Sequence, residues 1–174
     1  MSTNLKRLTI VAMLLAMAIV LNYLESFIPI FVPGVRLGLA NVIILIMLYE
    51  FKWYEAFAVD ILRILIVALI RATFLSPTFF MALSGGLLSF LIMFLFSRIK
   101  IFSKIGVSVL GSLSHALGQI IVAIIMLESV DLIYYLPFIA LLSLATGILS
   151  GVIASLYLKR SITNKFVENE NVNE

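Results

Sequence analysis

The sequence predicts an all-α integral membrane protein, a bundle of six transmembrane helices, from three observations. Hydrophobic residues make up 63% of the 174 residues and charged residues only 12%, whereas a soluble domain is roughly half apolar and about a quarter charged. The mean hydropathy is +1.22, so lipid must be the solvent for most of the chain. The apolar runs are continuous and do not alternate with polar residues, which argues against a closed β-barrel. We expect helices over residues 6–27, 37–51, 55–75, 78–98, 105–127 and 136–159.

The first helix follows Lys6 and Arg7 without a small-residue cleavage site after it, so we expect an anchor and not a removed signal peptide. Two prolines and two glycines in the segment 28–38 exclude a regular helix there. At membrane depth such a segment must be buried in protein or line a cavity. The second helix, 37–51, is short compared with the roughly 20 residues that cross a bilayer core of about 30 Å.

The third helix is interrupted by charged residues, and the fourth starts at a Ser76-Pro77-Thr78 turn with proline in the first helical turn. The fifth and sixth helices are free of charged side chains over most of their length. The remaining segment, 161–174, is polar and is expected to fray as a cytoplasmic tail. The chain therefore divides into a transmembrane domain over 1–160 and this tail.

Six crossings put both termini on one side of the membrane. Nine basic residues fall on that side, namely Lys6, Arg7, Lys52, Arg98, Lys100, Lys104, Lys159, Arg160 and Lys165. Three fall elsewhere, namely Arg36, Arg63 and Arg71. Because basic residues accumulate on the cytoplasmic side, this bias predicts cytoplasmic N- and C-termini. It also explains the net charge of +3 better than nucleic-acid binding does.

Metal sites and cofactors are not expected from the composition. The chain has no cysteine and a single histidine, His115, which excludes disulfides, thiolate sites and a histidine-built metal cluster. No glycine-rich phosphate loop for ATP is present either.

Charged residues within a span usually face a cavity or a partner, since each costs at least about 2.5 kcal/mol on insertion scales. Asp60 and Arg63 are three residues apart and can pair across one turn. Arg71 has no acidic residue within a turn and is a candidate ligand-binding residue. The alternative is a structural Asp60–Arg63 pair with an Arg71 that extends toward the membrane surface.

A polar stripe marks the fifth helix, where Ser108, Ser112, His115 and Gln119 share one face at mid-membrane. The three other polar residues beside His115 favour a pocket wall. The alternative is that a lone histidine at this position is a hydrogen-bonded packing residue. Gly111 and Gly118 flank the stripe and would let a neighbouring helix approach closely.

Asn22 and Glu25, one turn apart, close the first helix. Arg36, followed by Asn41 at the start of the second helix, supplies hydrogen-bond donors suited to an anionic or carbonyl group. The alternative is an interfacial loop whose arginine binds lipid headgroups. In the fourth helix, Ser84 precedes paired glycines that leave room for a ligand or another backbone.

Ala12 and Ala16 form a small-x-x-x-small pair on the first helix, on the face opposite Glu25. One face of this helix could thus meet another protein while the other lines the interior. Such pairs are common in membrane helices.

Three stretches of the sequence bear on its family: residues 33–41 (PGVRLGLAN), 85–89 (GGLLS) and 112–119 (SLSHALGQ). With them the chain resembles, over about Leu5 to Arg160, the bacterial Gx transporter family, whose members are labelled heptaprenyl diphosphate synthase component I. That family is similar to the substrate-binding S components of energy-coupling-factor transporters. The resemblance implies a six-helix protein of the bacterial cell membrane that docks on a membrane coupling subunit with two cytosolic ATPases. It implies a docking face at Ala12 and Ala16.

The label heptaprenyl diphosphate synthase can be compared with the aspartates that such an enzyme needs. Prenyl transferases bind diphosphate through magnesium held by clustered aspartates, and this chain has two separated aspartates, Asp60 and Asp131. It therefore has no catalytic residues of its own for that reaction, although it could be an accessory subunit.

We expect the substrate-binding component of an energy-coupling-factor-like transporter for a small anionic or polar-headed molecule, and the apolar surroundings suit an aromatic or isoprenoid body. Its expected binding residues are Asn22, Glu25, Arg36, Asn41, Arg71, Ser84, His115 and Gln119. The alternatives are a membrane accessory subunit of a heptaprenyl diphosphate synthase and a stand-alone secondary carrier.

Overall fold

The computed structural model describes residues 3–28 and 35–172, with side chains for residues 5–28 and 35–160. Its described part is all-helical. The elements are α1 (Thr3–Glu25), α2 (Asn41–Glu50), α3 (Trp53–Ile70), α4 (Pro77–Ser97), α5 (Lys104–Leu127), the 3-10 helix η1 (Val130–Tyr135) and α6 (Leu136–Val172).

Four helical segments in the described part are long and apolar enough to cross a membrane: Leu5–Glu25, Pro77–Ser97, Lys104–Leu127 and Val130–Arg160. The other two α-helices, α2 and α3, are not among these four segments. α3 has 18 residues and carries Glu55, Asp60 and Arg63. α2 has only 10 residues, hence a length of about 15 Å. The fold is therefore consistent with a multi-pass membrane protein.

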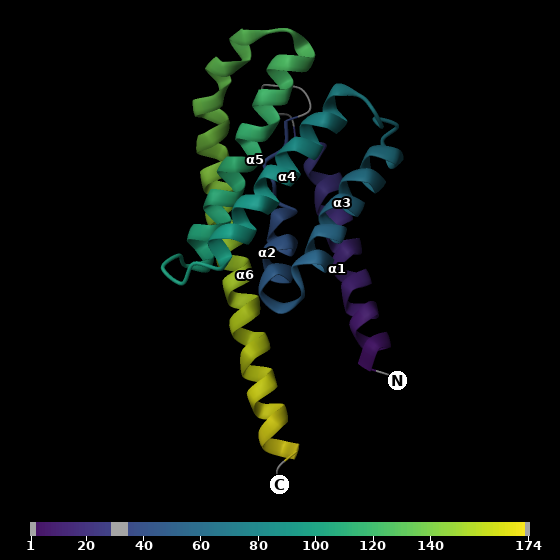
Figure 1. Cartoon of the computed structure of the whole chain (residues 1–174), viewed down its shortest axis with the longest axis vertical. Coiled ribbons are helices and arrows are strands. Elements are labelled where there is room, and N and C mark those ends of the chain that lie inside the picture. Colours follow the sequence, from purple (N-terminus) through teal and green to yellow (C-terminus); the bar gives the residue numbers. More distant parts are fainter. Residues whose placement is uncertain (1–2, 29–34, 173–174) are drawn as a thin grey trace.

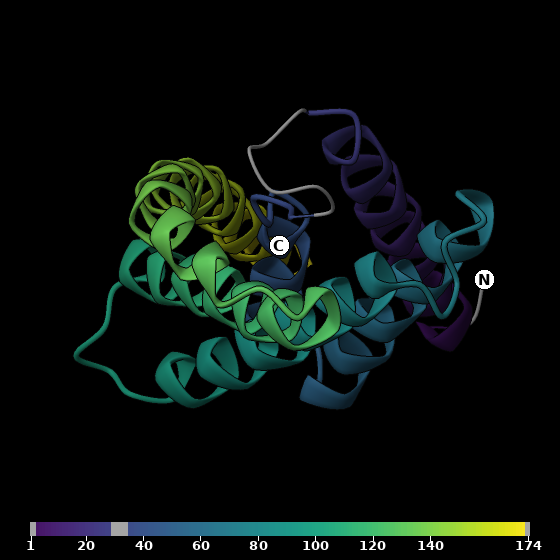
Figure 2. The ribbon, with the colours of Figure 1, turned by 90° about the horizontal axis from the view of Figure 1, so that it is seen from above.

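Successive helices run in alternating directions, and α1 begins and α6 ends toward the same, lower end of the bundle (Figure 1). α2 lies in the middle and packs against α1, α3, α4, α5 and α6. Figure 2 shows it between α1 and α6 when the bundle is seen from above. Since α2 contacts five other helices, its residues from Asn41 to Met47 are all buried. A helix that is apolar all round suits such a position.

Two of the helix ends that differ from the sequence prediction are explained by backbone geometry. The second helix starts at Asn41 and not at 37, because Gly38 has a φ of +83°. That conformation breaks a helix and favours glycine. The third helix ends at Ile70 and not at 75, where Ala72 and Leu75 have φ values of +53° and +61°. Of the segment 28–38, residues 29–34 lie outside the described residues, and 35–38 are buried.

α6 continues to Val172, well past its predicted end at 159. No glycine or proline occurs from Val152 to Val172 to interrupt it. The backbone of the polar segment 161–172 is therefore helical in this structure, and its fraying stays a prediction. Its cytoplasmic location stays a prediction.

Close packing of α4 on α5 depends on glycines, as predicted for Gly111 and Gly118. A Cβ at Gly118 would stand 2.8 Å from the carbonyl oxygen of Ser84, and one at Gly111 would stand 2.5 Å from Met93. Such distances leave no room for a side chain. α4 therefore approaches α5 closely along the polar stripe.

Candidate functional site

Buried polar side chains from five helices and one connection gather in the bundle. We call them the polar cluster: Asn22, Glu25, Arg36, Asn41, Asp60, Arg63, Ser89, His115 and Gln119. Each is at most 5% exposed. The cluster is flanked along α4 and α5 by apolar side chains, with Met93 and Val107 on one side and Met81 and Ile120 on the other. Polar groups in such surroundings need partners within the protein.

Arg36 is fixed to α5 and α1 by three hydrogen bonds. Its backbone N–H donates to Oε1 of Gln119 over 2.7 Å, and its carbonyl oxygen accepts from Nε2 of Gln119 over 2.8 Å. Its guanidinium donates through Nη1 to Oδ1 of Asn22 over 2.5 Å. The side-chain amide of Gln119 therefore satisfies both backbone groups of a buried, non-helical residue and holds the connection against α5.

Glu25 holds the start of α2. One of its carboxylate oxygens accepts hydrogen bonds from the backbone N–H of Gly38 and, over 3.3 Å, from that of Leu39. A negative charge at the N-terminal end of a helix is favourable because the helix dipole is positive there. Asn22, Glu25 and Gln119, all predicted to bind a ligand, are thus engaged with the chain's own backbone or with Arg36.

Asn41, Asp60 and Arg63 form a second network that joins α2, α3 and α4. Oδ1 of Asp60 accepts from Nε and Nη2 of Arg63 over 2.9 and 2.6 Å, which is the ion pair that the spacing predicted. Nη2 of Arg63 also donates to Oδ1 of Asn41 over 2.9 Å, and Nδ2 of Asn41 donates to Oγ of Ser89 over 3.0 Å. Within the described residues, Oδ2 of Asp60 has no hydrogen-bond partner.

His115 is the member of the polar cluster with the most unused hydrogen-bonding capacity. It is 4% exposed, and neither ring nitrogen has a partner of good geometry in the described part of the chain. Its ring lies beside two glycines: a Cβ at Gly85 would be 3.1 Å from Cε1, and one at Gly38 would be 3.5 Å from Cδ2. A side chain at Gly85 would crowd the ring, whereas the distance at Gly38 is an ordinary van der Waals contact. Apart from the nearby Gly85 backbone, the ring nitrogens have no partner among the described residues, which leaves hydrogen-bonding capacity for a ligand or a water.

Arg71 lies at the C-terminal end of α3, half-buried, and is close enough to Arg36 for the two positive charges to repel. Arg63 also acts electrostatically on Arg36, and Glu25 opposes both. In the described residues this region holds three arginines against two acids, Glu25 and Asp60. The surplus positive charge would favour an anion.

Besides Arg71, three predicted residues lie outside the polar cluster. Oγ of Ser84 is within hydrogen-bonding distance of the carbonyl oxygens of Met81, at 3.0 Å, and Gly118, at 2.9 Å, and so contributes to α4–α5 packing. Ala12 and Ala16 are both exposed on α1. Ala12 also lines a cavity of about 440 Å³ between α1 and α3.

Two members of the site were not predicted as binding residues, Ser89 and Gly38. Ser89 lies one turn after Gly85 on the buried face of α4, so helical spacing from the paired glycines could have found it. Gly38 has no side chain and acts through its φ and its N–H. No pattern in the sequence predicts this role of Gly38.

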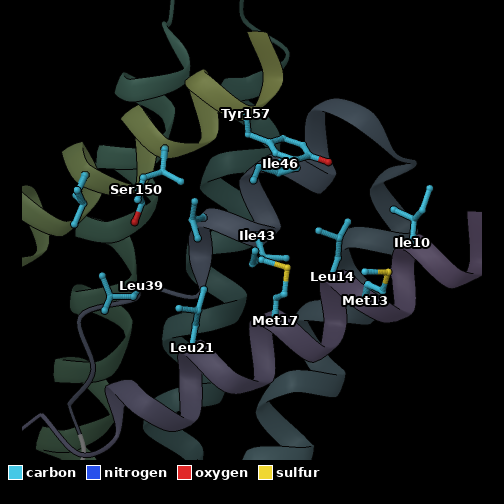
Figure 3. Close-up of a pocket in the computed structure, with 13 residues that line it drawn as sticks. Ile10, Met13, Leu14, Met17, Leu21, Leu39, Ile43, Ile46, Ser150 and Tyr157 are labelled. Carbon is cyan, nitrogen blue, oxygen red and sulfur yellow. The ribbon is translucent and has the colours of Figure 1, made fainter. Parts of the chain in front are cut away.

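An apolar groove runs along the bundle between α1 and α6, with α2 as its floor (Figure 3). We call it the α1–α6 groove. It is lined by residues of α1 between Ile10 and Leu21, of α2 between Val42 and Ile46, and of α6 between Leu149 and Tyr157, together with Leu39. Its volume is about 550 Å³, within the range of about 300–1,000 Å³ typical of small-molecule sites.

The chain matches the model of the family described as heptaprenyl diphosphate synthase component I over residues 14–157. The chain belongs to this family. No curated protein and no solved structure matches it. The matched range includes the whole polar cluster and most of the α1–α6 groove. The family description names one component of a larger assembly, which suggests a partner subunit.

Proposed function

We propose that this protein is the membrane-embedded, substrate-binding component of an energy-coupling-factor-like transporter for a small anionic molecule. The observation that carries the proposal is the surplus of positive charge around Arg36, with Arg63 and Arg71 opposed by Glu25 and Asp60. The buried Arg36 and Arg63 are balanced by Glu25 and Asp60, so the surplus charge is that of the half-buried Arg71. A charged side chain at membrane depth usually faces a cavity or a partner, and an anionic substrate would be that partner.

In this proposal the bundle crosses the bacterial cell membrane six times, with both termini in the cytoplasm. The common lower end of α1 and α6 supports it (Figure 1). α2 would cross together with the connection before it, since its own 10 residues are too few. The polar N-terminal end of α2, where Asn22, Glu25 and Arg36 meet, would then face outward.

The substrate would be held by groups that the chain's own contacts leave available. Arg36 and Arg71 would attract the anion, because guanidinium groups bind phosphates and carboxylates with directed hydrogen bonds. His115 would donate or accept a hydrogen bond through its unpartnered ring nitrogens. Asn41 and Gln119 would orient the arginines through their hydrogen bonds to Arg63 and to the Arg36 backbone. Ser84 would act on the spacing of α4 and α5 and not by direct contact.

Binding of inorganic diphosphate to the protein in lipid nanodiscs, followed by calorimetry, tests the proposal. Replacing Arg36 with Gln keeps a donor for Asn22 and removes the charge. We expect this change, and Arg71→Gln, to weaken diphosphate affinity by about 10- to 100-fold, since a hydrogen bond to a charged group contributes about 1.5–3 kcal/mol. The control is Arg98→Gln, because Arg98 follows α4 at the other end and stacks on Phe94. Equal affinity in all three variants and the wild type would contradict the proposal.

Docking on a coupling subunit would use the face of α1 that carries Ala12 and Ala16, both exposed. The double replacement Ala12→Leu and Ala16→Leu should abolish co-purification with that subunit and its ATPases, because close helix contact needs small side chains. Ala145→Leu, at an exposed position of α6, is the matched control. Unchanged co-purification of the double variant would refute the docking face.

A second function is favoured by the family description: a membrane subunit of a heptaprenyl diphosphate synthase. The anion would then be a diphosphate held for a separate catalytic subunit, and the chain itself would not be the catalyst. Purification of the tagged protein distinguishes the two. A co-purifying prenyl transferase whose rate depends on this chain favours the synthase, whereas a coupling subunit with ATPases favours transport.

A further inference from the structure

The α1–α6 groove separates two helices that do not meet. Both pack against α2, and within the described residues no Cα atom of α1 lies within 8 Å of one of α6. The groove wall is apolar except for Ser150 and Tyr157. Met13 and Met17, on its α1 side, are 62% and 53% exposed. In a membrane the groove would therefore open sideways to the lipid tails.

The dimensions of the groove fit one acyl chain and not a helix. Along α1 it runs from Ile10 to Leu21, which at 1.5 Å per residue is about 16 Å. One leaflet contributes about half of a hydrocarbon core of about 30 Å, so this length matches one leaflet. Divided by that length, the volume of about 550 Å³ gives a mean cross-section of about 34 Å². A helix about 10 Å across needs about 80 Å², so a partner helix does not fit inside.

One end of the groove lies at the level of a membrane surface. This is the end at Ile10, near the N-terminal end of α1 and opposite to the end at Leu21 (Figure 3). The start of α1 is joined to the start of α3 by the ion pair of Arg7 with Glu55, over 2.6 Å. Next to Glu55, Tyr54 is 49% exposed, and tyrosines collect where a bilayer meets water. We call this the surface end of the groove.

Each side wall of the groove continues into a basic residue at the surface end. Lys6 precedes Ile10 by four residues on α1, and Arg160 follows Tyr157 by three residues on α6. Residues three or four apart share one face of a helix, so both basic residues lie on the faces that line the groove. Both are exposed. Glu50, which ends α2 and acts electrostatically on Tyr157, opposes them, and these three residues together keep one positive charge.

We propose that the α1–α6 groove binds one acyl chain of an anionic phospholipid, whose phosphate lies at the surface end near Lys6 and Arg160. The second acyl chain stays in the surrounding bilayer. This goes beyond the proposed function, because the lipid is a resident of the protein and not its cargo. Basic residues at a membrane surface attract anionic headgroups, and the flexible methionines of the wall adapt to an irregular chain. Because bulk lipid tails are as apolar as the groove, the charge of the headgroup supplies the selectivity.

Native mass spectrometry of the delipidated protein, titrated with phosphatidylglycerol or with phosphatidylcholine of the same acyl chains, tests the headgroup. We expect one phosphatidylglycerol per chain to bind before any phosphatidylcholine does. Lys6→Gln and Arg160→Gln should each weaken phosphatidylglycerol binding by about fivefold, the effect of one basic residue near a membrane surface. The control is Lys100→Gln, because Lys100 is exposed in the connection between α4 and α5 and does not line the groove.

Filling the groove tests the place of the acyl chain. Met17→Trp puts a bulky ring into the groove from an exposed position and should abolish the binding of this one lipid. Met126→Trp is the control, since Met126 is 43% exposed on α5 and does not line the groove. Thermal midpoints close to that of the wild type show that the variants are folded. If Met17→Trp does not fold, the exposed Lys6 and Arg160 variants still decide the inference.

Three results would overturn the inference. The first is equal affinity for the two phospholipids, and the second is undiminished phosphatidylglycerol binding by a folded Met17→Trp variant. The third is a dimer mass that Met17→Trp abolishes, which would mean that a second copy of the chain covers the groove. None of the three affects the proposed function, because Arg36-dependent binding of inorganic diphosphate does not involve the groove.

Discussion

Replacing Gln119 with Leu tests how the buried connection is held in place. In the wild type the Gln119 amide satisfies both the N–H and the carbonyl oxygen of Arg36, over 2.7 and 2.8 Å. Leucine fills a similar volume but leaves both groups buried without partners. Each unsatisfied group costs about 1–3 kcal/mol, so the free energy of unfolding should fall by about 2–6 kcal/mol. Arg36 would also lose its fixed position, and diphosphate affinity should fall with it.

The matched control is Ser112→Ala on the same stripe of α5. The Ser112 hydroxyl is 0% exposed and has no hydrogen-bond partner in the described part of the chain. Its removal therefore breaks no bond and relieves a desolvated group. We expect a change of less than about 1 kcal/mol, or a small stabilisation.

Reversible unfolding in mixed detergent micelles measures both variants, with the fluorescence of Trp53 as the probe. Trp53 is the only tryptophan and packs near Phe94 at the start of α3. If Gln119→Leu and Ser112→Ala change the free energy of unfolding equally, the Gln119–Arg36 contact does not hold the connection. The reasoning about the site would then be wrong.

Two further predictions use the same unfolding measurement. Gly118→Ala should destabilise the protein by about 1–3 kcal/mol, because its Cβ would meet the Ser84 carbonyl oxygen at 2.8 Å. The control Gly106→Ala, whose Cβ would be 3.4 Å from its nearest neighbour, should be neutral or stabilising by up to about 1 kcal/mol. Equal losses of stability in the two variants would contradict the close packing of α4 on α5. Arg63→Met should cost about 3–5 kcal/mol by leaving Asp60 buried without its ion pair. The double variant with Asp60→Leu should recover most of that loss, and no recovery would mean that the pair is not the cause.

The sequence predicted the helices well because long charge-free runs have few alternatives to a helix in lipid. It located helix ends poorly where the backbone decides them. The start of α2 depends on the positive φ of Gly38 and on the carboxylate of Glu25, which is 13 residues earlier. Likewise, Ala72 and Leu75 end α3 although neither residue type is a helix breaker. Such ends follow from tertiary contacts.

The candidate site was predicted in composition but not in connectivity. Helical spacing placed Ser112, His115 and Gln119 on one face, and the structure buries all three. Spacing also predicted the Asp60–Arg63 pair. Which distant group each side chain binds could not be derived, since the Gln119–Arg36 contact joins residues 83 positions apart.

Native mass spectrometry of mildly extracted protein tests most directly the claim that these side chains form one anion site. We expect the wild type to retain an anionic small molecule, Arg98→Gln to retain the same mass, and Arg36→Gln to lose it. A wild type that carries no anion, or an Arg36→Gln variant that retains it fully, would contradict the account.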